Sequence, residues 1–262
     1  MIRLFLTLCF IYSAHVFSQE SEYKYVPERN TAEYYFGSFN KGKDISDVAK
    51  WYGEFAKWAE TQGGVYDSMT VALLQPYFHR DLASHDFMWV NNWPDSAAQF
   101  KGLEVWTKDP KANALFAKLP AKNSQVVSTV QWAISQPRST DAGNFILAQY
   151  NSCKLNEGTS LRTYYDAYVD FAKMAQENGD VQGRKLIIPG PGYDGDADFI
   201  RLVYTSAVSE RGEGIEFWRS ELRDTDERRA LVGMADCGNG SIYVGPVLRL
   251  SLIHISEPTR PF

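Results

Sequence analysis

The sequence predicts an α+β protein in which one β-α-β-β-α-β unit occurs twice. The main observation is an internal repeat, because residues 102–106 (GLEVW) return as residues 214–218 (GIEFW). A second echo keeps the same order: residues 55–59 (FAKWA) precede a glycine, and residues 171–175 (FAKMA) do so again. Two echoes in one order indicate that the chain contains one structural unit twice. They determine the architecture but not the chemistry.

Both ends of the chain are expected to lie outside this fold. Residues 1–18 carry one early basic residue, a short apolar run and a small-residue close, which is typical of a secretory signal peptide. Residues 19–32 are polar and aperiodic and are expected to form a loose leader. Residues 250–262 resemble a translated sequencing adapter and are excluded from the fold. We therefore expect a secreted or periplasmic protein with no membrane span after signal cleavage.

The composition argues against one class of partner. The formal net charge is −5, and no block of like charges stands out. A nucleic-acid surface would need a basic stripe, so no nucleic-acid partner is expected. Aromatic residues are plentiful, with 7 Trp, 15 Tyr and 15 Phe.

The first unit is assigned to residues 33–136. Its first helix has apolar positions at three- and four-residue steps, among them Val48, Phe55 and Trp58, so that one stripe faces a core. Asp44 or Ser46 can cap this helix. A proline after residue 109 breaks the second helix. The expected elements are strand 33–40, helix 44–62, strands 69–79 and 86–93, helix 95–109 resuming over 114–119, and strand 125–134.

The second unit is assigned to residues 144–249, after a linker at 137–143. The element order of the first unit repeats here, and its first helix again ends at a glycine, Gly179. The expected elements are strand 144–151, helix 159–178, strands 185–188 and 198–206, helix 210–222 extending toward 231, and strand 241–249. Each unit has the ferredoxin-like arrangement.

A four-stranded sheet with both helices on one face leaves its other face bare, and two such faces can cover each other. In element order and duplication the chain resembles a tandem, pseudo-dimeric member of the dimeric α+β barrel superfamily. That group includes cofactor-free monooxygenases, some haem proteins and isomerases. The resemblance implies strand order 4-1-3-2 in each unit and sheets packed face to face. No catalytic signature of the group is found, so no functional residue is transferred and no cofactor is expected.

Strand alternation divides each sheet into two faces. Met88 and Val90, matched by Ile200, Leu202 and Tyr204, form an apolar face that is expected under the helices. The opposite face is expected to line a cavity between the two sheets, because it mixes aromatic and polar groups. It contains Phe87, Trp89, Asn91 and Trp93 in the first unit, and Phe199, Arg201, Val203 and Thr205 in the second.

The candidate ligand site follows from these faces, because an apolar cavity with a few convergent polar groups is typical of small-molecule sites. The alternative is that the same residues only close the interface between the halves. The candidate residues are Tyr77, His79, Trp89, Asn91, Gln131 and Arg201.

Two local patterns are set aside. Residues 190–195 (GPGYDG) match a dinucleotide fingerprint, but a strand follows where a helix is needed. Metal-ligating residue types gather at one hairpin, although neighbours in sequence are a weak signal, and no metal site is predicted. They are His79, Asp81, His85 and Asp86.

Two cysteines remain after the signal segment, Cys153 and Cys237. One follows the first strand of the second unit and the other precedes its fourth strand. In the expected sheet order these strands are antiparallel neighbours, so their cysteines meet. The sequence therefore predicts a disulfide.

Three functions remain open. The first is a binding protein that holds a small, partly aromatic ligand between its sheets. The second is a cofactor-free oxygenase or isomerase in which Tyr77, His79 or Asn91 polarises the substrate. The third is an assembly protein whose barrel is filled by its own side chains. The repeated Glu104 and Glu216 are interpreted as helix-surface carboxylates rather than acid-base groups.

Overall fold

The computed structural model describes residues 24–138 and 145–249. The predicted signal peptide and the adapter-like tail lie outside these residues, as does most of the predicted linker. No helix in the described ranges is long and apolar enough to cross a membrane.

The described chain alternates strands and helices in the order that the repeat predicts. The elements of the first half are β1 (Arg29–Phe39), α1 (Ile45–Glu60), β2 (Thr70–Phe78), β3 (Phe87–Trp93), α2 (Ser96–Lys108), α3 (Pro110–Phe116) and β4 (Ala121–Ser135). Those of the second half are β5 (Phe145–Leu155), α4 (Leu161–Glu177), β6 (Gly183–Pro189), β7 (Phe199–Thr205), α5 (Val208–Phe217), a π-helical turn (Trp218–Leu222), α6 (Asp226–Met234), β8 (Ala235–Cys237) and β9 (Ser241–Arg249).

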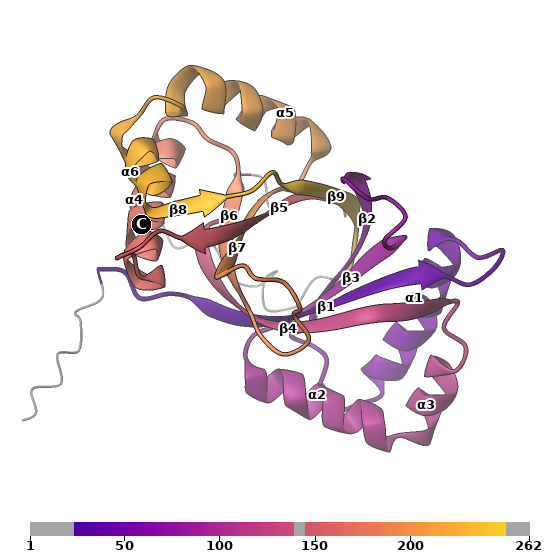
Figure 1. Ribbon diagram of the computed structural model, residues 1–262. Coiled ribbons are helices and arrows are strands. Elements are labelled where there is room, and N and C mark those ends of the chain that lie inside the picture. Colours follow the sequence, from indigo (N-terminus) through magenta and orange to yellow (C-terminus); the bar gives the residue numbers. More distant parts are fainter. Residues whose placement is uncertain (1–23, 139–144, 250–262) are drawn as a thin grey trace, which may run out of the picture.

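The strands form a closed antiparallel barrel (Figure 1). In the first half the order is β4-β1-β3-β2, and in the second half it is β9-β5-β7-β6. Both orders are 4-1-3-2, so this prediction is confirmed. The halves also join edge to edge, through β2 with β9 and β4 with β6. The bare sheet faces therefore enclose one barrel interior, and the seams leave neither half with an open strand edge.

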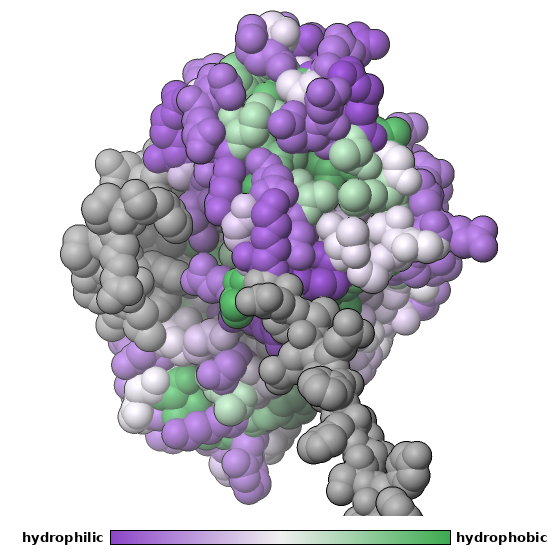
Figure 2. Space-filling view, turned by 90° about the vertical axis from the view of Figure 1, so that its left-hand side faces the viewer, coloured by the Kyte–Doolittle hydropathy of each residue, from purple (hydrophilic) through white to green (hydrophobic). Residues whose placement is uncertain are grey.

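The helices lie outside the barrel in two groups (Figure 1). Helices α1–α3 cover the first half, and α4–α6 cover the second. Side-chain caps start the first helix of each group: Asp44 accepts two backbone N–H bonds at α1, and Ser160 caps α4. Seen from the side that carries α4 and α6, the surface is mainly hydrophilic, with smaller apolar areas between (Figure 2).

The predicted assignment of the two sheet faces is wrong. Phe87, Trp89 and Trp93 lie under α1–α3, and Phe199 lies under α4. The interior of the barrel holds instead the face that was expected under the helices, with Met88, Val90, Ile200, Leu202 and Tyr204. An eight-stranded barrel has an interior just wide enough to be filled by side chains or to hold one small ligand. The large aromatic residues pack instead against the aromatic stripe of α1.

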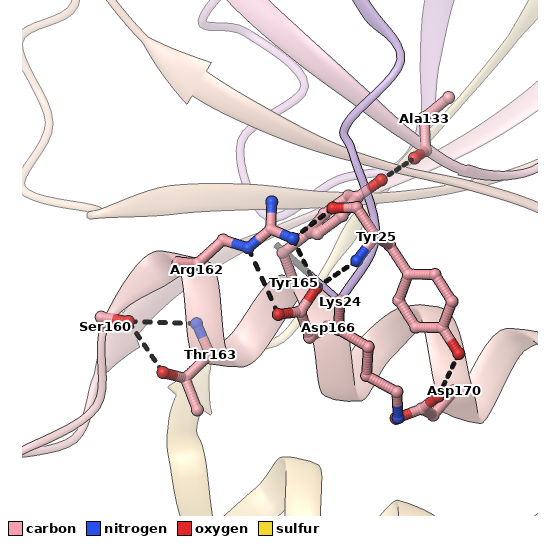
Figure 3. A network of polar contacts seen from close by, with 9 residues as sticks. All are labelled: Lys24, Tyr25, Ala133, Ser160, Arg162, Thr163, Tyr165, Asp166 and Asp170. Atoms are coloured by element: carbon pink, nitrogen blue, oxygen red, sulfur yellow. Dashed lines mark hydrogen bonds and ion pairs between the residues drawn. The ribbon is translucent and has the colours of Figure 1, made fainter. Parts of the chain in front are cut away.

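The first strand begins at Arg29, and the segment before it contacts α4 (Figure 3). The hydroxyl of Tyr25 donates to Asp170 at 2.7 Å, and the Tyr25 backbone N–H donates to Asp166 at 3.3 Å. Arg162 holds Asp166 in an ion pair at 2.8 Å and also donates to the Tyr25 carbonyl. This segment, from a range expected to be a loose leader, is bonded to a helix of the second half.

The predicted disulfide between Cys153 and Cys237 is confirmed. The two residues are register partners in the pairing of β5 with β8, with Cα atoms 4.1 Å apart. Cys237 lies in a short separate strand just before β9, and both strands pair with β5. The bond closes a segment of 84 residues, a separation at which cross-linking constrains the unfolded chain strongly.

Candidate functional site

A cavity of about 120 Å³ lies between the outer face of the first sheet and helices α1–α3. We call it the aromatic pocket. Its lining residues come from β1, β3 and the helices, and its aromatic members are Tyr35, Trp51, Phe55, Tyr66, Phe87, Trp89, Trp93, Trp106 and Phe116. Two residues at its rim, Leu103 and Phe116, are 42% and 53% exposed, so the pocket opens toward solvent between α2 and α3.

The carboxylate of Glu33 is the charged group in the aromatic pocket. Glu33 is 9% exposed, and four side chains donate hydrogen bonds to it. The donors are Asn91 and Gln99, each at 3.1 Å, and Tyr35 and Trp93, each at 3.3 Å. All four are neutral, and none of the ion pairs found between described residues includes Glu33. The pocket therefore contains a buried carboxylate held by dipoles alone.

Two tyrosine hydroxyls near Glu33, those of Tyr35 and Tyr66, are kept in their neutral form. Burial raises the pKa of the Tyr35 hydroxyl well above its usual range, and the carboxylate adds to that rise. The same two causes, in the same order, raise the pKa of Tyr66. Both hydroxyls remain protonated near neutral pH and act as donors, Tyr66 to the carbonyl of Gly102 at 2.7 Å.

The repeated GLEVW segment shapes the pocket through its glycine. Gly102 of α2 lies directly on the Trp93 ring, and a Cβ at this position would clash with that ring. The glycine thus lets α2 approach the sheet closely enough to close the pocket. Trp106, one turn later, is partly buried and packs edge-on against Phe55 at 5.6 Å and Trp58 at 5.1 Å. Glu104 points to the surface and pairs with Lys108.

The six candidate ligand residues do not converge. Trp89 and Asn91 line the aromatic pocket, with the Trp89 indole N–H donating to Asn91 at 2.6 Å. Gln131 lies inside the barrel, and Arg201 lies under the helices of the second half. Tyr77 is 61% exposed at the end of β2.

His79 follows β2 and stacks edge-on against Tyr243 and His85. The six residues therefore do not line one common cavity between the sheets. Whether any of them binds a ligand stays a prediction.

The barrel interior is packed with side chains, as the third hypothesis expects. Gln131 donates to the Tyr34 hydroxyl at 2.7 Å and accepts from Lys185 at 3.0 Å. Burial lowers the pKa of Lys185 to about 8, and the charge of Glu28 opposes the shift. At another point of the interior, His85 Nε2 lies 3.1 Å from the Tyr243 hydroxyl. The aromatic pocket, in contrast, lies outside the barrel.

Glu33 was missed at the sequence level, where it counted only as the first residue of a strand. The available signal was a single acidic residue opening an aromatic run (EYYF). Strand alternation places Glu33 on the face of Tyr35, which is the helix-covered face. The inverted face assignment would in any case have directed this carboxylate into the barrel.

No family model matches the chain, and no curated protein matches it. Among solved structures, the chain is similar to a monooxygenase candidate from Fusobacterium nucleatum, with 10% identity, a TM-score of 0.51, and 85% of this chain and 94% of that chain covered. It is also similar to an anthrone oxidase-like protein, with 11% identity, a TM-score of 0.49 and coverage of 85% and 92%. A third is chlorite dismutase from Candidatus Nitrospira defluvii, with 11% identity, a TM-score of 0.46 and coverage of 85% and 92%.

At these identities the likeness concerns the fold. These likenesses fit the α+β barrel fold, and the group that the sequence resembles includes some haem proteins. The imidazoles of the described chain, His79 and His85, lie at the end of β2 and beside Tyr243, and neither lines the aromatic pocket. The residues of this pocket therefore do not fit a histidine-ligated haem. Within the described residues, no group of three or more His, Cys, Asp or Glu side chains could hold a metal ion.

Proposed function

We propose that the protein is a secreted or periplasmic binding protein whose aromatic pocket holds a small organic cation with an aromatic or apolar body. The observation that carries the proposal is the buried Glu33 carboxylate, which has four neutral donors and faces an aromatic cavity. The predicted ligand site between the sheets moves, in this proposal, to the space between one sheet and its helices.

The chemistry of the pocket selects the charge of the ligand. A buried carboxylate is stable only when paired or well hydrogen-bonded, and neutral donors offset only part of its desolvation. A ligand ammonium group would complete the pairing. The faces of tryptophan and tyrosine rings attract cations as well, by roughly 0.5–2 kcal/mol for each contact.

The size of the pocket limits the ligand to about one ring. A dry cavity of roughly 150 Å³ in another protein holds benzene. The aromatic pocket, at about 120 Å³ and open at its rim, suits a benzylammonium-sized molecule. The proposed location rests on residues 1–18 and is supported by the Cys153–Cys237 bond, because disulfides persist in oxidising compartments.

The test compares three ligands of one shape and different charge. Isothermal titration calorimetry at pH 7 would measure benzylamine, benzyl alcohol and benzoate against the mature chain. We expect benzylamine, a cation at this pH, to bind at least about tenfold more tightly than benzyl alcohol, which corresponds to about 1.4 kcal/mol. Benzoate should show no binding.

Variants locate the effect at Glu33. Glu33→Gln should remove the preference for the cation and leave benzyl alcohol binding similar. Glu104→Gln, on the exposed face of α2, is the matched control and should behave as wild type. Equal binding of benzylamine and benzyl alcohol to the wild-type protein would contradict the proposal.

The enzyme alternative uses the same pocket. A buried carboxylate beside a bound ligand is placed as a general base needs to be, and the reacting proton would be on the ligand. In deuterated buffer, catalysis would appear as exchange of a C–H hydrogen of the ligand for deuterium. This exchange should be lost in Glu33→Gln. Binding without exchange would favour the binding protein.

A further inference from the structure

Four arginines gather on the outer face of the second half, beneath α5 and α6. Arg184 comes from β6, Arg201 from β7, Arg211 from α5 and Arg228 from α6. We call them the arginine cluster. Arg184 is 3% exposed, whereas the other three are only partly covered. None of the four belongs to the aromatic pocket.

The cluster has more positive charge than its surroundings balance. Asp180 forms a buried ion pair with Arg184. Arg211 donates to the side-chain carbonyls of Gln182 and Gln149, which are neutral. Its pKa is lowered first by burial and then by the neighbouring arginines, with Asp180 opposing them.

Arg201 and Arg228 belong to none of the ion pairs found between described residues. Arg201 lies beside Tyr164, whose pKa is raised by burial to about 12, and Arg201 opposes that rise. The pKa of Arg228 is lowered by burial and by Arg201, with Tyr164 opposing. The acidic residue that opens α5, Glu210, accepts a bond from the backbone N–H of Ala207.

Two donors of the cluster are unused. The Nε atoms of Arg201 and Arg211 are buried, and neither has a hydrogen-bond acceptor in the described structure. Buried donors are nearly always paired with protein or with an ordered solvent or ligand atom. A guanidinium whose Nε is free presents a fork that matches the two oxygens of an oxyanion.

The two halves of the protein carry opposite charges where the second helix of each unit contacts the first strand. In the first half, Gln99 of α2 donates to Glu33 of β1. In the second half, Arg211 of α5 donates to Gln149 of β5. Gln99 precedes Gly102 by the same number of residues as Arg211 precedes Gly214, so the helix residues correspond.

The strand residues correspond as well. Glu33 pairs in register with Asn91, and Gln149 pairs with Val203, which follows Phe199 at the distance that separates Asn91 from Phe87. The Glu33 carboxylate of the first half thus corresponds to the Gln149 amide of the second. The Gln99 amide of the first half corresponds to the Arg211 guanidinium of the second.

We propose that the arginine cluster binds a small oxyanion, with Arg201 and Arg211 as its direct ligands. An oxyanion supplies the acceptor that both Nε atoms lack and balances the buried charge. Phosphate, sulfate and carboxylates share this chemistry. This site is independent of the proposed cation site in the first half.

The test measures binding of each anion to the full mature chain. Thermal unfolding would be followed in sodium phosphate, sulfate, acetate and chloride at matched ionic strength, and calorimetry would give the dissociation constant of whichever anion stabilises most. A ligand that binds only the native state raises Tm with concentration. We expect one oxyanion to raise Tm well above chloride.

Substitutions separate the cluster from general surface charge. Arg211→Gln should lower the affinity for that anion at least tenfold. Arg201→Gln provides a second variant in case the first does not fold. Arg219→Gln removes one exposed positive charge from the adjoining π-helical turn and should leave affinity unchanged. An equal Tm in all four salts, or equal loss of affinity in Arg211→Gln and Arg219→Gln, would overturn the proposal.

Discussion

At the scale of single residues, the charges of Glu33 and Arg211 are held by hydrogen bonds rather than by ion pairs. Glu33 has four neutral donors, and Arg211 has two amide acceptors. Such arrangements are costly unless a ligand or a network completes them. The hydrogen-bond partners of both groups are neutral and leave the charge of each group available to a ligand, which is why both proposals begin from these two side chains.

His85 should make stability depend on pH. It is 7% exposed, and burial lowers its pKa below the usual 6.5, with His79 adding to the effect. The unfolded chain therefore takes up a proton near pH 6.5 that the folded protein resists. Stability should be fully present above that pH and should decrease as the pH falls below it.

Urea unfolding at pH 7.5 and pH 5.5 measures this dependence. The decrease in unfolding free energy should be smaller in His85→Gln than in wild type. His79→Gln removes only the second of the two causes that lower the His85 pKa, so it should reduce the dependence by less than His85→Gln does. If His85→Gln shows the full wild-type decrease, the fold does not hold His85 in its neutral form.

At the scale of elements, the distance of α2 from the sheet is determined by Gly102. A methyl group at this position would clash with Trp93, which itself packs in the first-half core. Gly102→Ala should therefore cost about 1–3 kcal/mol, as overpacking does. Gly53 lies in the middle of α1, where an added methyl group would meet nothing within 4 Å, so Gly53→Ala should stabilise by about 0.5–1 kcal/mol.

The two glycine changes are measured in one experiment, by urea unfolding at pH 7. We expect the two changes in unfolding free energy to have opposite signs. Helix propensity favours alanine at both positions, but only the methyl group in α2 would clash with a ring. Two stabilising changes would show that α2 can move away from Trp93 at no cost.

The sequence predicts elements and their order well because these depend on local patterns. The stripe of Val48, Phe55 and Trp58 indicated α1, and all three side chains are buried. The strand order 4-1-3-2 follows from the β-α-β-β-α-β pattern, and it placed Cys153 beside Cys237. The helix broken at Pro110 is two helices, with Asp109 capping the second.

The candidate site was predicted less well for a physical reason. Alternation shows that Trp89 shares a face with Asn91, but not which face the helices cover. That choice depends on how side chains from the whole molecule pack, because strands of both halves share the barrel interior while the rings of Phe87, Trp89 and Trp93 pack under α1–α3. The donors around Glu33 come from β1, β3 and α2, so their meeting is a tertiary fact that no local pattern contains.

At the scale of the whole molecule, two seams hold the halves together. The β2–β9 seam and the β4–β6 seam complete the barrel, and the apolar interior is shared by strands of both halves. In the β4–β6 seam, Ser128 donates to the Pro191 carbonyl and accepts from the Gly190 N–H, both at 2.9 Å. A half produced alone would expose two strand edges and one apolar sheet face, which are the features that drive association.

The first half, residues 24–138, should therefore associate when it is produced alone. We expect size-exclusion chromatography with light scattering to show a dimer that closes a barrel from two copies, and a one-to-one complex when residues 145–249 are added. Ser128→Pro removes a backbone N–H that bonds across the β4–β6 seam and not to β1. In a dimer of the isolated half this change affects both seams, whereas in the intact chain the β2–β9 seam remains. The substitution should therefore weaken the dimer more than it destabilises the intact chain. A folded, monomeric first half would contradict this account, because it would show that one sheet and three helices bury enough apolar surface without the seams.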